Sequence, residues 1–393
     1  MTRDEANAFG KLVKTYRELR GWSQEELAER WGHSREYVSQ IERGKRKLDK
    51  QEQVYKLADI LSIPQERLDA IGKGIPERTY AATPTYGDTD VLLQALLEPA
   101  QNTVKMSWLL YQDPHGGIDI AGNLHQLQER LTGALDLYHG QFHTPALRML
   151  AYTHEMLGKL AIERTATQEA TAHFQELYDI AEEIGDVDLQ TLALMHQSEM
   201  FRRRGWYQAA ARRIEAAKRN IPHVSVYLQG SFWKVTARNS YVAGDEQEFL
   251  RAIDQAAAVA EAMKTPTIDT LSSEFDRVEV LQVRAQGFTF LWKPEKALEI
   301  YQQTDSLRPF RPVRYQSSYH IEKAQAYCYA GDIETGAIHA TAGMQMAESL
   351  RSRRYVMRLR EMADRISVTP IGKKQSMKEL REEIHTTLQR MSH

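Results

Sequence analysis

Apolar residues recur at helical spacing along almost the whole chain. Stripes with spacings of three and four residues predict five short helices before about residue 72 and a long series of helices after about residue 90. Valine and isoleucine never alternate with polar residues over more than a few positions, so the expected fold class is all-α. The first block is expected to hold helices at Asp4–Leu19, Gln24–Trp31 and Arg35–Arg43, an apolar stripe at 54–61, and a last helix opened by Ser62-Ile63-Pro64.

The second and third helices are bounded by residues that cap helices. Ser23, with Glu26 three positions later, has the pattern of a capping box, and Ser34 is placed to cap the next helix. Gly32 lies in the three-residue turn between the two helices, and Gly44 ends the third helix. Two short helices joined by a three-residue turn that contains glycine make a helix-turn-helix.

The second helix of such a unit enters the DNA major groove, and its N-terminal half reaches the base edges. Here that half carries Arg35, which suits guanine, Gln40, which suits adenine, and Glu36, which suits cytosine. A basic loop at residues 43–47 follows and is placed to contact phosphate. The alternative is a protein-interaction module that has lost DNA binding, but the chemistry of the contact positions favours DNA.

The segments Ser23-Gln-Glu-Glu-Leu-Ala and Ser34-Arg-Glu-Tyr-Val-Ser-Gln-Ile-Glu-Arg-Gly-Lys resemble the Cro/CI phage-repressor type of helix-turn-helix, the xenobiotic-response-element (XRE) family. The resemblance covers residues 8–71 and implies a five-helix, lambda-repressor-like domain with a structural ion pair between Arg17 and Glu42. The bulky Tyr37 either leans on the DNA backbone or packs within the domain. The candidate DNA-binding residues are Gln24, Ser34, Arg35, Glu36, Tyr37, Ser39, Gln40, Arg43 and Lys45.

Small residues recur at a fixed spacing in the long helical part. Two series step together by 40, 39, 48 and 39 residues, with turns that contain glycine or proline between their members. Paired helices need small residues where their axes cross closely, because a large side chain would push the axes apart. The series are Gly158, Ser198, Ala237, Ala285, Ala324 and Ala170, Ala210, Phe249, Ala297, Gly336.

This pattern resembles an array of tetratricopeptide (TPR) repeats, with a period longer than the usual length of about 34 residues. A small residue followed by six others and then Gly-Asp stands at 237–245 and again at 324–332. The 48-residue step is explained by an extra loop at 265–269. The resemblance implies a right-handed TPR-like superhelix of helix pairs.

Glycine and proline gather between residues 72 and 90, in a stretch without helical or strand periodicity, which predicts a linker. The apolar stripe of the last helix either caps the array or forms half of a dimer seam. That stripe consists of Met377, Leu380, Ile384, Leu388 and Met391. The expected domains are a helix-turn-helix domain at 1–72, a linker at 73–90, a TPR-like sensor and dimerisation domain at 91–370, and a capping or dimer helix at 371–393.

A superhelix of helix pairs has a concave groove lined by the first helix of each pair. Four basic residues fall on the groove face of two neighbouring repeats, and such a patch suits a carboxylate or an acidic peptide. The alternative is a solvated face whose arginines pair with Glu199 or other neighbours. The candidate ligand-binding residues are Glu199, Arg202, Arg203, Lys234, Arg238, Asn239, Tyr241, Gln282, Gln286 and Gln325.

Composition narrows the class of protein. The 393 residues include 51 Lys and Arg against 53 Asp and Glu, a formal net charge of −2 that leaves room for local basic patches. Cys328 is the only cysteine, which excludes an intrachain disulfide and favours the cytoplasm. No apolar run approaches the ~18 residues of a membrane span. Because the chain carries no phosphate-binding loop, nucleophile elbow or zinc-protease motif, we expect neither an enzyme nor a cofactor or metal.

The order of helix-turn-helix, linker and helical repeats resembles the RRNPP group of peptide-responsive quorum-sensing regulators. That resemblance rests on architecture, and it implies a homodimer that binds a double-stranded DNA operator. It also implies that a short peptide, or another small ligand, binds in the groove and alters operator binding. The alternative is a protein-docking scaffold whose helix-turn-helix serves as an address and which a partner protein regulates.

Overall fold

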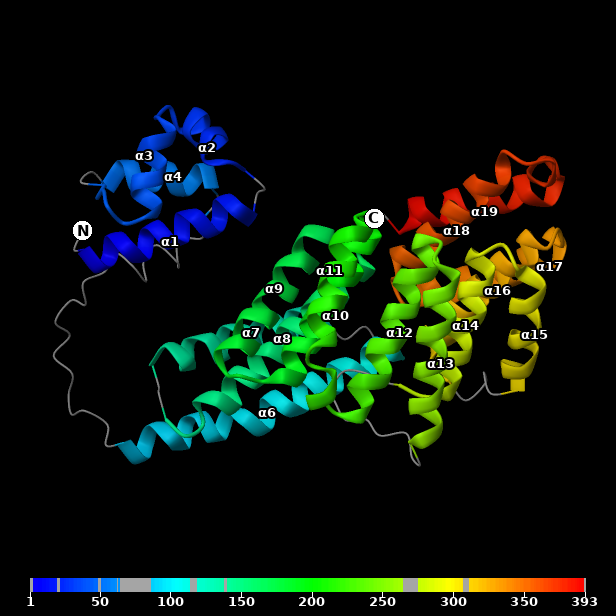
Figure 1. The fold of residues 1–393 in the computed structure, drawn as a ribbon, viewed down its shortest axis with the longest axis horizontal. Helices are drawn as coiled ribbons and strands as arrows, with labels where there is room; N and C mark the ends of the chain where they lie inside the picture. The colour runs from blue at the N-terminus through cyan, green and yellow to red at the C-terminus, as the bar shows by residue number, and fades with distance from the viewer. Residues whose placement is uncertain are drawn as a thin grey trace. The chain divides into compact units, whose positions relative to one another are not determined.

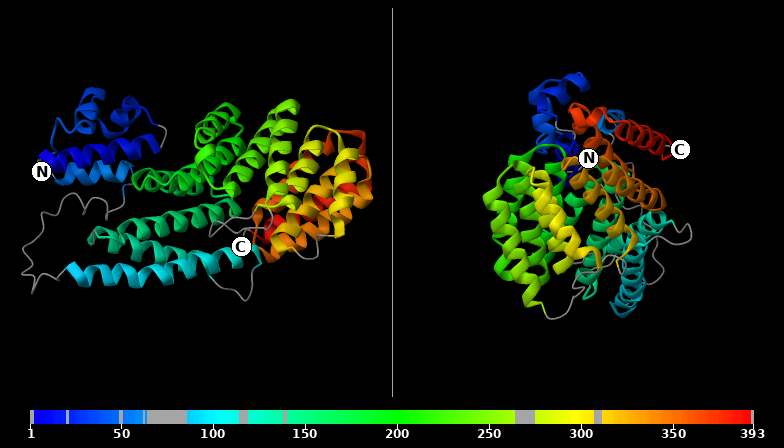
Figure 2. Two further views of the ribbon diagram at one scale, coloured as in Figure 1. Left: turned by 60° about the horizontal axis from the view of Figure 1, so that its bottom comes forward. Right: turned by 90° about the vertical axis from the view of Figure 1, so that its right-hand side faces the viewer.

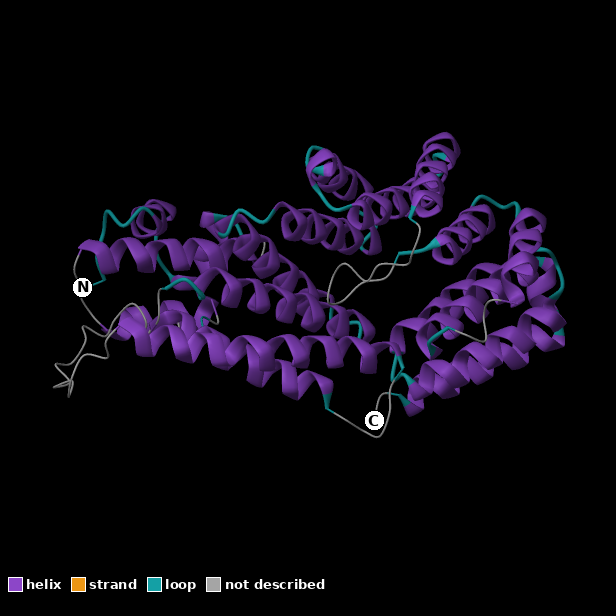
Figure 3. Ribbon diagram, turned by 90° about the horizontal axis from the view of Figure 1, so that it is seen from below, coloured by secondary structure: helices purple, strands orange, loops and turns teal. Residues whose placement is uncertain are grey.

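The computed structural model describes residues 3–19, 22–48, 51–61, 63, 86–113, 119–137, 140–263, 275–306 and 311–391. Over these ranges the regular structure is helical throughout, with no strand (Figures 1 and 3). The chain divides into two compact units, Met1–Thr83 and Pro84–His393. The expected all-α fold is therefore confirmed.

The first unit packs four described helices around one apolar core. The close crossing of α1 and α3 depends on Gly10, because a Cβ there would lie 2.2 Å from the carbonyl oxygen of Ile41. The predicted fifth helix and the predicted linker up to residue 85 lie outside the described residues. The helices are α1 Arg3–Leu19, α2 Gln24–Trp31, α3 Arg35–Glu42 and α4 Gln51–Leu61.

The predicted helix caps are present in this unit. The Ser23 hydroxyl accepts from the backbone N–H of Glu26 at 3.1 Å, and the Glu26 carboxylate accepts from the backbone N–H of Ser23 at 2.6 Å. These hydrogen bonds lower the pKa of Glu26. Gly32 ends α2 with φ at 75°, in the left-handed region that glycine adopts without strain. Ser34 caps α3 by accepting from the N–H of Tyr37.

The second unit is a row of helix pairs. Consecutive helices from α8 onward pack as hairpins, and the first helix of each pair from α10 onward also contacts the first helix of the next (Figure 2). Helix α6 begins at Tyr86, within the range expected for the linker. The helices are α6 Tyr86–Gln112, α7 Ile120–Leu137, α8 His143–Glu163, α9 Thr167–Glu183, α10 Val187–Arg203, α11 Tyr207–Lys218, α12 Val226–Ala243, α13 Glu246–Ala262, α14 Arg277–Phe290, α15 Pro294–Thr304, α16 Val313–Tyr329, α17 Ile333–Ser349, α18 Arg353–Ser367 and α19 Gln375–Arg390.

Every member of the two predicted series is buried, and all but Phe249 are small residues. A Cβ on Gly158 in α8 would meet the ring of Phe174 in α9 at 2.5 Å. A Cβ on Gly336 in α17 would meet the sulfur of Cys328 in α16 at 2.4 Å. The proposed source of the 48-residue step, at 265–269, lies outside the described residues.

The C-terminal apolar stripe is buried within the chain itself. Met377, Leu380, Ile384 and Leu388 belong to one apolar cluster with Leu359 of α18, and α19 packs against both α17 and α18. Helix α19 is thus the second helix of the last pair. This packing accounts for the stripe without a partner chain.

The row of pairs also closes on itself. Helix α16 contacts α6, and α18 contacts α8, although these elements lie some two hundred residues apart in the sequence. The first helices of all the pairs from α8 to α18 therefore face a common interior.

Two glycine substitutions test the crossing argument. We expect Gly158→Ala to lower the free energy of unfolding by about 1–3 kcal/mol, because the added methyl group would overlap the fully buried Phe174 ring. The matched control is Gly133→Ala in α7, where the new methyl group would meet open space. That control is expected to raise stability by about 0.5–1 kcal/mol through helix propensity. Chemical denaturation of both variants measures the difference, and equal effects would contradict the packing role of Gly158.

Candidate functional site

The predicted DNA-facing residues gather on one surface of the first unit. The exposed ones include Arg35, Glu36, Arg43 and Lys45. Gln24, Ser39 and Gln40 are half-buried beside them. Together they place guanidinium, amide, carboxylate and ammonium groups at the start of α3 and in the basic loop after it. The residues that line this shared surface hollow are Gln24, Arg35, Glu36, Ser39, Gln40, Arg43 and Lys45.

Ser34 and Tyr37 are not among the residues that line the hollow. Ser34 uses its hydroxyl as the α3 cap. The Tyr37 ring stacks on the His33 ring at a centroid distance of 4.5 Å. The guanidinium carbon of Arg46 lies 4.4 Å from the centroid of the Tyr37 ring. Tyr37 therefore packs within the domain, and a contact of this half-exposed ring with DNA stays a prediction.

A buried ion pair holds this surface together, as the family resemblance implied. Arg17 Nε donates to Glu42 Oε1 at 2.5 Å, and Arg17 Nη1 donates to the carbonyl oxygen of Trp22 at 2.7 Å. The second oxygen of Glu42 accepts from Gln24 Nε2 at 2.7 Å. The hydrogen bond to Glu42 is the main cause that raises the pKa of Arg17. Glu42 therefore links α1, α2 and α3 and fixes the side chain of Gln24 beside the recognition helix.

The second unit contains a pocket of about 590 Å³ that is partly open to solvent, a size typical of small-ligand sites. It is lined by the first helices of the pairs from α8 to α18, with the end of α6, which is the concave surface expected from the sequence. Nine of the ten candidate ligand-binding residues line it: Glu199, Arg202, Arg203, Lys234, Arg238, Tyr241, Gln282, Gln286 and Gln325. The tenth, Asn239, is not among the lining residues, and its amide donates to Ser198 Oγ at 2.7 Å.

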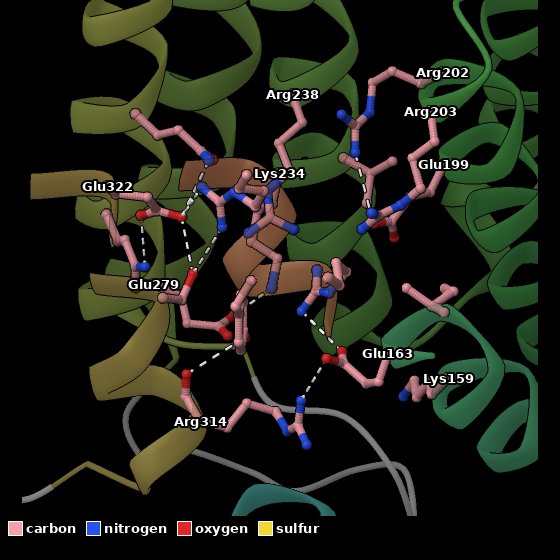
Figure 4. A pocket seen from close by; sticks show the side chains of 18 of the residues that line it. Lys159, Glu163, Glu199, Arg202, Arg203, Lys234, Arg238, Glu279, Arg314 and Glu322 are labelled. Atoms are coloured by element: carbon pink, nitrogen blue, oxygen red, sulfur yellow. Dashed lines mark hydrogen bonds and ion pairs between the residues drawn. The ribbon is translucent and has the colours of Figure 1, made fainter. Parts of the chain in front are cut away.

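Several of the polar and charged side chains in the lining form a connected network (Figure 4). Glu322 accepts from Gln282 at 2.7 Å, from Gln286 at 3.1 Å and from Arg358 at 3.1 Å. Gln286 in turn accepts from the hydroxyl of Tyr241 at 2.7 Å. Each side chain of this network is hydrogen-bonded to another member, so the network fixes the orientation of these side chains on the cavity wall.

The excess charge in the cavity is positive. Among the described residues that line it, nine are Lys or Arg and five are Glu. Lys234 pairs with Glu279, and Arg203 pairs with Glu199. Such a lining suits an anionic or zwitterionic ligand.

Several important lining residues were missed by the sequence analysis. Some come from α8 and α18, to which no groove residue was assigned, although buried Ala363 in α18 continues the first series 39 residues after Ala324. Others come from α14 and α16, where only part of the groove face was assigned. A signal was present in the arginine-rich segment 353–365. The missed charged residues include Lys159, Glu163, Glu279, Arg314 and Glu322, which Figure 4 labels, together with Arg354 and Arg358.

Glu163 sits where the array closes, and we call its surroundings the Glu163 cluster: Tyr111, Glu163, Arg314, Ser352 and Arg354. The carboxylate lies 3.0 Å from Arg314 Nη1 and 2.9 Å from Arg354 Nη2. It also accepts from the hydroxyls of Tyr111, at 2.9 Å, and of Ser352. The Arg314 guanidinium stacks over the Tyr111 ring at 3.6 Å and donates to the Tyr111 carbonyl oxygen. One buried carboxylate thus joins α6 and α8 to α16 and α18.

The protonation of Glu163 depends on these partners. Burial by itself would raise the pKa of this carboxyl, but the charges of Arg354 and Arg314 and the two hydroxyl donors outweigh burial and lower it to about 2. Glu163 is therefore ionised at neutral pH and compensates both arginines.

Within the described part of the chain, no group of three or more His, Cys, Asp or Glu side chains is arranged to hold a metal ion. Burial raises the pKa of the Cys328 thiol to about 12, so the sulfur stays protonated and packs as an apolar atom. None of the described helices is both long enough and apolar enough to cross a membrane.

Comparisons with known proteins were made for the whole chain. A family model described as a helix-turn-helix domain matches residues 8–71, and the first unit is a helix-turn-helix domain. No curated protein matches the chain. Among solved structures, the chain is similar to Bacillus thuringiensis PlcR in complex with the peptide PapR7 and DNA, with 13% identity, coverage of 86% of this chain and 99% of that chain, and a TM-score of 0.36. It is also similar to a signal-transduction ATPase with a tetratricopeptide repeat sensor from Pyrococcus horikoshii, with 10% identity, coverage of 94% and 60%, and a TM-score of 0.42.

Removal of the Glu163 charge tests the closing contact. We expect Glu163→Gln to lower the free energy of unfolding at neutral pH by about 3–5 kcal/mol, because it leaves two buried guanidinium groups without a counter-charge. The control is Glu334→Gln in α17, which removes an exposed carboxylate 3.8 Å from Lys374 and is expected to cost no more than about 1 kcal/mol. Denaturant titration compares the two variants, and similar losses would show that Glu163 does not hold the array closed.

The pH dependence of stability gives a second test. The folded pKa of Glu163 lies below its usual value of 4.5, so its stabilisation is complete above about pH 4.5 and is lost as the pH falls toward about 2. Wild-type protein is therefore expected to lose stability more steeply than Glu163→Gln over this range. Thermal melts at half-unit pH intervals measure both slopes, and parallel slopes would be inconsistent with an ionised Glu163.

Proposed function

We propose that this protein is a cytoplasmic, sequence-specific DNA-binding transcriptional regulator. The observation that carries this proposal is the exposed surface of the helix-turn-helix domain, where Arg35, Gln40 and the basic loop come together. Arg35 and Gln40 suit guanine and adenine edges, and Arg43 and Lys45 suit the phosphates that flank them.

The second part of the proposal is that the helical repeats bind a short peptide or another small ligand, and that binding alters operator affinity. The support is the cavity, because a concave space with apolar walls and several converging polar side chains is typical of ligand sites. A docking scaffold for a partner protein would instead need a broad exposed apolar patch. The charged, concave lining favours ligand binding over docking.

The proposed mechanism is coupling between the cavity and DNA through a homodimer. A two-fold dimer would present two recognition helices to half-sites about one or more helical turns apart. A ligand that draws the first helices together would change the curvature of the repeat array, since each pair contacts its neighbours. A change in the separation of the recognition helices would then change operator affinity.

DNA binding by the full-length protein tests the first part of the proposal. We expect wild type to bind a specific site in the region upstream of its own gene, and Arg35→Ala with Gln40→Ala to weaken that binding at least tenfold, since each base contact contributes roughly 1–3 kcal/mol. The control is Lys14→Ala, which removes one positive charge from the exposed face of α1. Fluorescence anisotropy at fixed salt measures all three affinities. If the double variant binds as tightly as wild type, these residues do not read DNA.

A further inference from the structure

Two arginines in the cavity differ from the other buried cations that line it. Lys234, Arg314, Arg354 and Arg358 each lie within ion-pair distance of a glutamate. Arg238 in α12 makes no hydrogen bond or ion pair with any residue that the structure describes. Its guanidinium points into the cavity (Figure 4).

Arg202, at the end of the neighbouring helix α10, is only partly satisfied. Its Nε is buried and lacks a hydrogen-bond partner among the described residues. Its Nη2 lies 3.6 Å from Glu199 Oε1, beyond hydrogen-bond distance, and that oxygen already accepts from Arg203. Glu199 therefore neutralises Arg203 better than it neutralises Arg202.

The two arginines differ in how well the protein compensates them. Burial lowers the pKa of Arg202, and the positive charges of Arg203 and Arg238 lower it further, against the opposite effect of Glu199. Burial also acts to lower the pKa of Arg238, but Tyr241 and the charges of Glu199, Glu279 and Glu322 outweigh it and raise that pKa. An arginine side chain stays charged in a protein, so Arg202 cannot relieve its environment by losing a proton. An anion held by both arginines would compensate Arg202 and give Arg238 a direct partner.

Nearby groups of the protein do not supply that anion. The Tyr241 hydroxyl donates to Gln286, and Glu322 is held by Gln282, Gln286 and Arg358. Glu279 pairs with Lys234. These carboxylates act on Arg238 from a distance, but among the described residues none of them makes an ion pair or hydrogen bond with it.

We propose that Arg202 and Arg238 form an oxyanion-binding subsite, and that the ligand of the cavity presents a carboxylate or phosphate group to it. The planar guanidinium donors suit the paired oxygens of either group. This inference rests on the ligand-binding part of the proposed function and names the chemistry of that ligand. The rest of the ligand would lie against the Glu322 network, whose amides and carboxylate offer both donors and acceptors.

The test uses the full-length protein and three probes: inorganic phosphate, citrate, and tetra-alanine with either a free or an amidated C-terminus. Isothermal titration calorimetry at constant ionic strength is expected to show binding of at least one oxyanion probe, weakened at least tenfold by Arg202→Gln with Arg238→Gln. Arg251→Gln, on the outer helix α13, removes the same charge outside the cavity and is expected to leave binding unchanged. Preference for phosphate, for citrate, or for the free over the amidated peptide then identifies the source of the oxyanion.

The melting temperatures of ligand-free variants test the proposal even if the probes bind too weakly to be detected. Arg238 has no hydrogen-bond or ion-pair partner in the described structure, so Arg238→Gln is expected to leave the melting temperature of ligand-free protein unchanged or raised. Arg358→Gln breaks the ion pair with Glu322 and is expected to lower the melting temperature. A marked loss of stability in Arg238→Gln would overturn the proposal, and so would equal probe binding by wild type and the double variant, or no binding of any oxyanion probe.

Operator binding in the presence of the probes separates this inference from the proposed function. Probes that bind through Arg202 and Arg238 but leave operator affinity unchanged would support the subsite and contradict the coupling to DNA. Protein that binds its operator but no oxyanion probe would contradict the subsite alone.

Discussion

The cavity depends on one buried carboxylate. Glu163 attracts two guanidinium groups from the far end of the repeat array, and this attraction holds α16 and α18 against α6 and α8. In an open solenoid each repeat contacts only its neighbours, and its concave surface is a broad trough. Here the ends meet, so the same surface becomes a pocket that is narrower than an open trough, although it stays partly open to solvent. Charges on its wall are closer together than on an open trough, and their pairing therefore matters.

In both units a buried glutamate joins several helices. In the helix-turn-helix domain, Glu42 joins Arg17 to Gln24 and thereby fixes three short helices around the recognition surface. In the repeat unit, Glu163 joins four long helices around the cavity. In each case a buried carboxylate accepts from several donors and so fixes the helices around a surface. In the first unit this is the predicted DNA-facing surface, and in the second it is the cavity wall.

Local and periodic features could be predicted from the sequence, and features produced by long-range closure could not. The capping box at Ser23 and the crossings marked by Gly158 and Gly336 depend on residues a few positions or one helix apart, so their patterns are visible in the chain. Most of the candidate groove residues do line the cavity, because a fixed count from each turn selects one helical face. Asn239 was chosen because it lies near that face, and its side chain turns instead toward Ser198 of the adjacent helix.

The Glu163 cluster had no such signal. Its members are spread over positions 111 to 354, and they meet only because small rotations between successive pairs add up over the whole array. In the sequence, Arg314 and Arg354 look like ordinary charged residues of amphipathic helices, because the accumulated rotation between helix pairs cannot be read from it. The Cro/CI resemblance supplied the Arg17–Glu42 pair, which the residue pattern alone did not reveal.

Closure has a consequence for how this architecture can change over time. Open arrays tolerate the gain or loss of a whole repeat, since the remaining units keep their neighbours. In this protein an added or deleted helix pair would displace Arg314 and Arg354 from Glu163 by an entire repeat. The number of repeats is therefore fixed by the ion pairs that join the two ends, while substitutions on the cavity wall remain open to variation. Descendants of such a chain would diversify by exchanging wall residues at constant length.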